Sequence, residues 1–223
     1  MASPGNLMAG KRGLIMGVAN DHSIAWGIAQ AAAAQGANLA FTYQTDAFAR
    51  RVGPLAESVD AAAMVQCDAS DPDSLDKAFA AIGDTWDNID FVVHAIAYSD
   101  KEELEGRYVN TSQENFLQTM NVSCFSFTAV AQRAAAMMSD SGSLLTLSYH
   151  GANAVMPNYN VMGVAKAALE ASVRYLASDL GPDGVRVNAI SAGPMRTLAG
   201  SAVGAARQIY NYSREVAPLR RNV

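Results

Sequence analysis

Short apolar runs alternate with helix-length segments along most of this chain of 223 residues. The runs predict strands at about residues 12–17, 38–43, 62–67, 89–94, 143–148 and 184–191. The segments between them predict helices at about 23–36, 46–58, 71–86, 112–138 and 157–180, the fourth opened by a capping box at Thr111. Such alternation predicts right-handed βαβ units and a parallel sheet. We therefore expect one doubly wound α/β domain over residues 1–223, with helices on both faces of the sheet.

Composition and charge argue against several other classes of protein. Hydrophobic residues make up 50% of the chain and charged residues 17%, which is typical of a folded globular protein. No uncharged apolar stretch reaches about 18 residues and the start lacks a secretory signal, so we expect no membrane span. The net charge of −5 argues against nucleic-acid binding. Cys67 and Cys124 predict buried, reduced thiols in a cytoplasmic protein, and the scattered His22, His94 and His150 predict no metal site.

Tyr159 and Lys166 are the candidate catalytic residues. They lie seven positions apart in a predicted helix, which is about two turns at roughly 3.6 residues per turn, so both side chains should project from one face. An ammonium beside a phenol stabilises the phenolate and should lower the pKa of Tyr159. The pair then predicts a proton donor that works near neutral pH. A surface tyrosine and a solvated lysine on an amphipathic helix explain the spacing about equally well.

The first predicted strand leads into a turn that suits a phosphate-bearing cofactor, because ligands of such sheets bind at the carboxyl ends of the strands. Gly17 allows a tight turn, and the amides of Ser23 and Ile24 at a helix N-terminus could bind a pyrophosphate. Gly27 should let the helix approach the sheet. The glycine spacing differs from the G-x-G-x-x-G fingerprint, and a plain strand–loop–helix turn explains it nearly as well.

The second predicted strand ends at Gln44, where a dinucleotide-binding fold selects its cofactor. An acidic residue there favours NAD and an arginine favours NADP. Gln44 is neither, and Thr45 and Asp46 follow, so a 2′-phosphate would lack a cation and NADH is predicted. Asp68 after the third strand could accept a hydrogen bond from the adenine amine, or serve as a turn residue.

The C-terminal segment is basic. Residues 196–223 hold five arginines and one glutamate, a charge of +4, so the remainder carries −9 for the net charge of −5. A basic end on an acidic protein predicts an anionic ligand or partner there. A solvated charged surface is the alternative.

The chain resembles the bacterial NADH-dependent enoyl-acyl-carrier-protein reductases of the short-chain dehydrogenase/reductase superfamily, which have a Rossmann fold. The similarity extends from about Gly10 to Arg221. The Tyr-x6-Lys spacing separates this family from ordinary short-chain dehydrogenases, which use Tyr-x3-Lys. The motifs that carry the resemblance are Gly17 with Ser23-Ile24-Ala25, Phe-Thr-Tyr-Gln44, Gln-Cys-Asp68, Tyr159-Asn-Val-Met-Gly-x-Ala-Lys166-Ala, Gly-x-Arg-Val-Asn-Ala-Ile-Ser-Ala-Gly-Pro194 and Arg-Thr-Leu-Ala199.

The resemblance implies a role for each matching residue. Tyr159 would bind the thioester carbonyl and stabilise or protonate the enolate, with Tyr149 as the second active-site tyrosine. Lys166 would hold the nicotinamide ribose and supply positive charge. Ser99 would contact substrate, and residues 195–212 would form a mobile lid over it. The other implied NADH-binding residues are Gly17, Ser23, Ile24, Gln44, Asp68, Ala69, Ile96, Met195, Arg196, Thr197, Leu198 and Ala199.

The implied reaction is hydride transfer from NADH to the double bond of an enoyl thioester on acyl carrier protein, in cytoplasmic fatty acid elongation. The family forms homotetramers through the predicted helices at about 112–138 and 157–180. The alternatives are a 3-ketoacyl reductase, which Tyr-x6-Lys disfavours, and an NADH-binding fragment without catalysis.

Two departures from the family pattern bear on these expectations. Ala97 replaces a common glycine and should narrow the space beside the nicotinamide. The family also continues past the Arg-Arg pair with a helix and a seventh strand, whereas this sequence stops at Val223. We therefore expect the final strand to be missing, an unpaired edge on the sixth strand and an assembly weaker than a tetramer.

Overall fold

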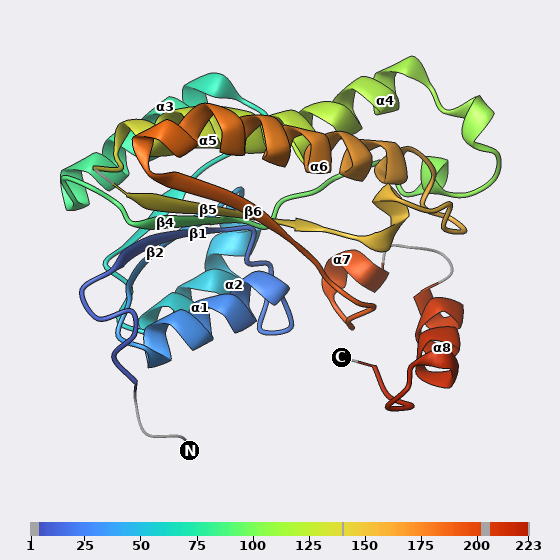
Figure 1. Ribbon diagram of the computed structural model, residues 1–223, viewed down its shortest axis with the longest axis horizontal. Helices are drawn as coiled ribbons and strands as arrows, with labels where there is room; N and C mark the ends of the chain where they lie inside the picture. The colour runs from blue at the N-terminus through green and yellow to red at the C-terminus, as the bar shows by residue number, and fades with distance from the viewer. Residues whose placement is uncertain (1–4, 140, 202–205, 223) are drawn as a thin grey trace.

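The computed structural model describes residues 5–139, 141–201 and 206–222 and places six parallel strands in one sheet. The strand order is β3-β2-β1-β4-β5-β6, the order of a doubly wound fold seen edge-on in Figure 1. The predicted parallel sheet and fold class are thereby confirmed. The strands are β1 (Arg12–Met16), β2 (Asn38–Tyr43), β3 (Ala63–Gln66), β4 (Phe91–His94), β5 (Gly142–Ser148) and β6 (Val185–Ser191).

Helices cover both faces of the sheet, as expected. Figure 1 shows α1 (Ile24–Ala34) and α2 (Asp46–Glu57) below the sheet. Above it lie α3 (Pro72–Thr85), α4 (Gln113–Met120), α5 (Ser126–Ala136) and α6 (Asn160–Leu180). Two further helices follow β6 beyond the carboxyl ends of the strands, α7 (Leu198–Ser201) and α8 (Ala206–Val216).

Most of the core lies in two apolar layers, one on each side of the sheet. Phe127, Leu144 and Leu169 are fully buried in the layer under α5 and α6. Ile15 and Phe41 are fully buried in the layer against α1 and α2. A sheet buried on both faces explains why its strands read as apolar runs without strict alternation. Cys67 and Cys124 are both buried and free, as predicted.

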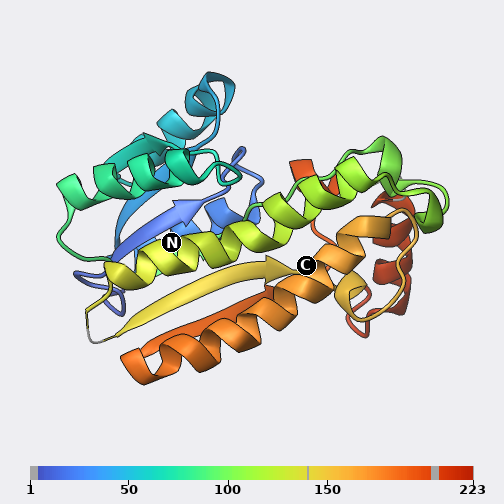
Figure 2. The ribbon, with the colours of Figure 1, turned by 90° about the horizontal axis from the view of Figure 1, so that it is seen from above.

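The helix predicted at 112–138 is interrupted. Residues 121–125 form a π-helical turn between α4 and α5, although Figure 2 shows the three pieces as one rod above the sheet. Ser126 donates a hydrogen bond back to the carbonyl of Val122 at 2.7 Å and lies 2.8 Å from His94. Helical spacing alone predicts no such turn, because its polar contacts come from a distant segment: the Ser123 hydroxyl donates to the carbonyl of Tyr98 and accepts from its amide, both at 2.9 Å.

The N-cap of α4 also differs from the prediction. Ser112, not Thr111, caps the helix, and its hydroxyl accepts from the amide of Asn115 at 3.1 Å. Thr111 instead donates to the carbonyl of Tyr108 at 2.8 Å. Within the described residues β6 pairs only with β5, so it forms an edge of the sheet. No helix in the described part of the chain is long and apolar enough to cross a membrane.

Candidate active site

Tyr159 and Lys166 come from opposite ends of the first two turns of α6. Tyr159 is the N-cap residue, and Lys166 is 6% exposed inside the helix. The Lys166 ammonium donates a hydrogen bond to the carbonyl oxygen of Leu147 at 2.7 Å. The lysine therefore reaches the carboxyl end of β5, where a ligand of this sheet is expected.

The predicted effect of Lys166 on Tyr159 is wrong. Burial is the main cause of a raised pKa for Tyr159, and the neighbouring Tyr149 raises it further. The charge of Lys166 is not among the causes of that shift. Burial lowers the pKa of Lys166 itself to about 8. The phenol of Tyr159 is thus protonated at neutral pH, and Lys166 keeps most of its charge there.

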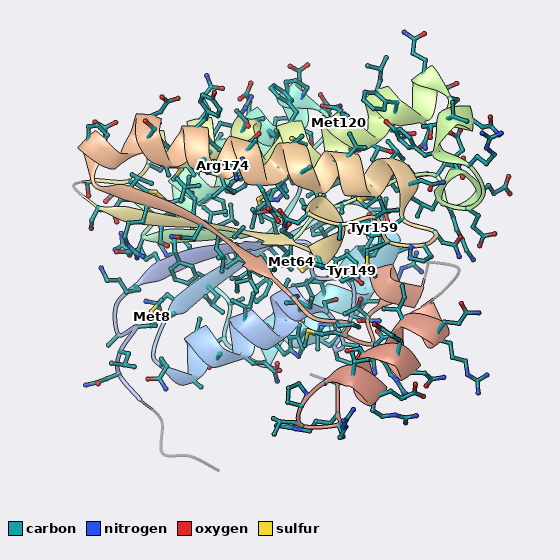
Figure 3. All side chains as sticks on the ribbon, turned by 45° about the vertical axis from the view of Figure 1, so that its right-hand side comes forward. Met8, Met64, Met120, Tyr149, Tyr159 and Arg174 are labelled. Carbon is teal, nitrogen blue, oxygen red and sulfur yellow. The ribbon has the colours of Figure 1, made fainter. Side chains whose placement is uncertain are left out.

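The two tyrosines of the site form an edge-to-face pair. The ring centroids of Tyr149 and Tyr159 are 5.1 Å apart and their planes meet at 68° (Figure 3). A 3₁₀ turn, His150–Ala152, lies against both rings. A Cβ added to Gly151 would lie 2.5 Å from Cδ1 of Tyr159 and 3.4 Å from Cδ1 of Tyr149. Only glycine therefore fits between the two phenols without displacing one of them.

The turn after β1 has the predicted tight geometry at Gly17. Its φ is +94°, and an added Cβ would lie 2.1 Å from the carbonyl oxygen of Ala95. Beside this turn is a cavity of about 340 Å³ at the N-terminus of α1. It is lined by Asp21, His22, Ser23, Ile24, Gly27, Ile28, Ala31 and Met195.

Two predictions about this turn need correction. The Ser23 amide is not free for a pyrophosphate, because it donates to the carbonyl of Asn20 at 3.1 Å. The Ser23 hydroxyl builds the turn by accepting from the amides of Ala19 and Asn20, at 2.9 and 3.1 Å. Gly27 does not bring the helix close to the sheet, since an added Cβ would meet nothing within 4 Å and the residue borders the cavity. Ile24 remains in the first turn of α1, where helix amides lack intrahelical acceptors.

Gln44 and Asp68 are brought together across the ends of β2 and β3. The Gln44 amide donates to the Asp68 carboxylate at 3.1 Å. Asp68 also accepts from the amide and hydroxyl of Ser70, at 2.9 and 2.6 Å. Burial alone would raise the pKa of Asp68, but these hydrogen bonds outweigh burial and lower it. Asp68 is therefore a charged turn residue beside Gln44, with Ala69 buried next to it.

The segment after β4 carries Ile96 and Ser99. Ile96 is partly buried against the core under α5. The Ser99 hydroxyl donates to Asn115 at 3.3 Å and accepts from Thr119 at 2.9 Å. Ser99 thus belongs to a polar cluster with α4. Ala97 is exposed at the surface of the same segment.

The segment after β6 folds back toward α1. Met195 borders the same cavity as Ser23 and Ile24, so the structure brings these predicted cofactor residues together. The Arg196 guanidinium lies 5.9 Å from the ring centroid of Tyr210 in α8. Thr197 accepts from the amide of Gly200 at 2.9 Å, and Leu198 begins α7. The side chain of Ala199 and part of the predicted lid, residues 202–205, lie outside the described residues.

The family model described as enoyl-(acyl carrier protein) reductase matches residues 17–223, nearly the whole chain and the whole site above. The chain belongs to the enoyl-(acyl carrier protein) reductase family.

Comparison with individual relatives gives the same family. The chain is 60% identical to enoyl-acyl-carrier-protein reductase (NADH) 2 of Rhizobium meliloti (strain 1021), over 97% of this chain and 81% of the relative. A crystal structure of the reductase of Anaplasma phagocytophilum in complex with NAD has a TM-score of 0.94 and 57% identity, over 98% of this chain and 83% of that one. The reductase of Bacillus cereus, solved with NADP⁺ and an indole naphthyridinone, has a TM-score of 0.94 and 47% identity, over 96% of this chain and 84% of that one.

His94 is a buried polar residue of this reductase that the sequence did not single out. Its Nε2 lies 2.8 Å from the Ser126 hydroxyl and its Nδ1 3.2 Å from the Thr146 hydroxyl. Burial, and after it the charge of Lys166, lowers the pKa of His94 to about 3. The imidazole is therefore neutral, and it links β4 to Thr146 of β5 and to Ser126 at the start of α5. Its position at the end of the apolar run 91–94 was the sequence signal that could have predicted a buried histidine.

Proposed function

We propose that Tyr149, Tyr159 and Lys166 perform the reaction of this family in this chain. The reaction is the NADH-dependent reduction of the trans-2 double bond of an enoyl thioester carried by acyl carrier protein, a step of fatty acid elongation. The observation that supports the residue roles best is the partly buried Tyr159 packed against Tyr149, with the buried Lys166 two turns further along α6. Lys166 is the only buried lysine among the described residues.

The residues at the strand ends fit a dinucleotide. Gly17 has a positive φ and packs against the backbone of Ala95, which gives the tight turn expected where a dinucleotide binds. Ile24 would border the pyrophosphate of the dinucleotide, and Met195 would border its nicotinamide carboxamide. Gln44, Asp68 and Ala69 would border the adenosine. NADH, when bound, supplies the hydride that is added to the β-carbon of the enoyl group. Ile96 would lie beside its nicotinamide.

Tyr159 acts as a hydrogen-bond donor to the thioester oxygen, where negative charge develops as the enolate forms. Its raised pKa keeps the proton on the phenol at neutral pH, so the donor is present throughout. Burial of the phenol lowers the local dielectric and strengthens this hydrogen bond. Tyr149, at the edge of the same ring, supplies a second phenol next to it.

Lys166 supplies positive charge and donors to the nicotinamide ribose. One of its three N–H groups is used by the Leu147 carbonyl, which directs the ammonium to the carboxyl end of β5. The other two remain for ribose hydroxyls. Its lowered pKa of about 8 leaves most of the charge in place at pH 7. Ser99 would contact the substrate from its cluster with Asn115 and Thr119.

Several further properties belong to the same proposal. Residues 195–212 would cover the bound substrate, with Arg196, Thr197, Leu198 and Ala199 next to the cofactor. Acyl carrier protein would approach the basic C-terminal segment, where Arg207 and Arg214 are exposed on α8. Self-association into a homo-oligomer, a tetramer in the full-length family, would use α4, α5 and α6. A cytoplasmic location suits a chain whose two cysteines are free.

NADH oxidation with crotonyl and longer enoyl thioesters tests this function. We expect turnover with both, and little with an acetoacetyl thioester, because the family reduces C=C. A parallel assay with NADPH tests the cofactor: the neutral Gln44 predicts that NADH is preferred. Faster turnover of the ketoacyl thioester would instead favour a 3-ketoacyl reductase. Binding of NADH without turnover of any thioester would indicate an inactive binding protein.

A further inference from the structure

Glu170 lies four residues after Lys166 in α6, so both side chains emerge from one face of the helix. That face is turned toward the carboxyl end of β5. Lys166 binds the carbonyl of Leu147 there, and Glu170 binds the next residue, Ser148, whose hydroxyl donates to Oε1 of Glu170 at 2.6 Å. Two successive residues of β5 are thus held by two successive turns of α6.

The second oxygen of Glu170 is also used. The side-chain amide of Asn153 donates to Oε2 at 3.3 Å. Ser148 directly precedes Tyr149, and Asn153 directly follows the turn His150–Ala152. One carboxylate therefore closes both ends of the short loop that carries Tyr149.

This loop also packs against α6 through contacts that are not hydrogen bonds. An added Cβ at Gly163 would lie 2.9 Å from the carbonyl oxygen of Gly151, so the loop backbone touches the helix there. Within the loop, the amide of Ala152 donates to the carbonyl of Tyr149 at 2.9 Å. Neither contact is a hydrogen bond from the loop to α6. Among the described residues, the Glu170 carboxylate is what fixes the loop to the helix by hydrogen bonds.

We propose that Glu170 is a positioning residue that holds Tyr149 in place through Ser148 and Asn153. The proposal rests on the role proposed above for Tyr149. Charge-assisted hydrogen bonds to a carboxylate are stronger than neutral ones, which suits a carboxylate at this position. Fixing the loop holds the Tyr149 and Tyr159 rings in their edge-to-face arrangement, with centroids 5.1 Å apart. Glu170 itself contacts neither ring.

Glu170→Ala removes both hydrogen bonds and leaves α6 otherwise unchanged. We expect kcat for an enoyl thioester to fall on the order of tenfold, because a catalytic group loses its fixed position. NADH affinity should stay near the wild-type value, since Lys166 keeps its bond to Leu147. Glu170→Gln keeps an acceptor for Ser148 and should retain most of the activity. Asp179→Ala is the control: Asp179 is an exposed carboxylate on the same helix, and its loss should leave kcat unchanged.

A double-mutant cycle separates positioning from general destabilisation. In a Tyr149→Phe background the Glu170→Ala change should cost much less than in the wild type, because no hydroxyl remains to be positioned. Equal losses of kcat in the two backgrounds would overturn the proposal that Glu170 acts by positioning Tyr149. A loss of NADH affinity in Glu170→Ala would also contradict the proposal.

Hydrogen exchange provides a test that needs no turnover. Amides of residues 149–154 should exchange faster in Glu170→Ala than in the wild type and in Asp179→Ala. Unchanged exchange would overturn the proposal whatever the activity. If the wild type reduced no enoyl thioester, the proposed function would fail, whereas the exchange experiment would still decide whether Glu170 holds the loop.

Discussion

The Lys166 ammonium lies 2.7 Å from the carbonyl oxygen of Leu147, at the carboxyl end of β5. The lysine and Tyr159 are thus separate parts of the site. The lysine is held at the end of β5, and the partly buried phenol forms an edge-to-face pair with Tyr149. The proposed roles differ, cofactor binding for Lys166 and stabilisation of the enolate for Tyr159, so variants of the two residues should have different effects.

Lys166→Met should weaken NADH binding. The change removes the charge and donors expected at the ribose, and hydrogen bonds to charged groups are worth enough to predict a loss of at least about tenfold in affinity. Turnover should be largely abolished. Fluorescence titration with NADH measures the affinity, with Lys77→Met, on α3, as the control. Wild-type NADH affinity in Lys166→Met would refute this role.

Tyr159→Phe should affect the reaction and not the cofactor. The phenylalanine keeps the ring beside Tyr149 but removes the donor to the thioester oxygen. Loss of such a donor typically costs on the order of 10²–10³ in kcat, and less if solvent supplies the proton after hydride transfer. Single-turnover NADH oxidation measures the rate. Loss of NADH affinity in this variant, together with its retention in Lys166→Met, would reverse our assignment.

Gly17→Ala should destabilise the protein. The residue has a φ of +94° and its Cβ would lie 2.1 Å from the Ala95 carbonyl oxygen, so both strain and a clash are expected, together about 1–3 kcal/mol. Gly83→Ala is the matched control. It lies inside α3 with nothing within 4 Å of an added Cβ, and should stabilise by about 0.5–1 kcal/mol. Thermal unfolding distinguishes the two; similar Tm shifts would contradict the steric argument.

His94 predicts a pH dependence of stability. Burial lowers its pKa from 6.5 to about 3, so below about pH 6.5 the unfolded chain binds a proton that the folded chain does not. The free energy of unfolding should therefore fall as the pH drops from about 7 to 5.5. His94→Gln should be less stable at pH 7 but show a shallower slope over this range. His22→Gln, which replaces an exposed histidine, should keep the wild-type slope.

Charge reversal on α8 tests the proposed approach of the carrier protein. Arg207→Glu with Arg214→Glu changes two exposed arginines seven residues apart, about two turns along one face. KM for carrier-linked enoyl substrate should rise, more so at low salt, while KM for a coenzyme A thioester should change little. Equal increases for both substrates would indicate that α8 acts through the fold of the lid.

Much of the site could be predicted from short sequence patterns. Gly17 was expected at a tight turn because glycine can adopt a positive φ, and its φ is indeed positive. The spacing of Tyr159 and Lys166 places both at the start of one helix. Gln44 and Asp68 were expected at the ends of two strands of one parallel sheet. In the structure the Gln44 amide donates a hydrogen bond to the Asp68 carboxylate. Parallel strands bring their carboxyl ends to one edge, so local patterns were sufficient for these positions.

Other features depend on contacts between residues that are distant in the sequence. The direction of the Tyr159 pKa shift was wrong because burial and Tyr149 determine it, and burial is a property of the packed protein. The Ser23 amide was expected to be free, but the loop before it folds back and binds that amide. The π-helical turn likewise has a partner that is distant in the sequence, because Ser123 exchanges hydrogen bonds with the backbone of Tyr98.

The sequence by itself determined the alternation of strands and helices, the parallel sheet and the residue types at the strand ends, because hydrophobic periodicity and backbone preferences act over a few residues. Only the tertiary structure decided which polar groups remain available to a ligand. Ser23, Ser99 and Glu170 carry groups that could bind ligands, yet each makes hydrogen bonds within the protein. A buried polar group must find a partner on folding, and that partner is fixed by the packing of the whole chain.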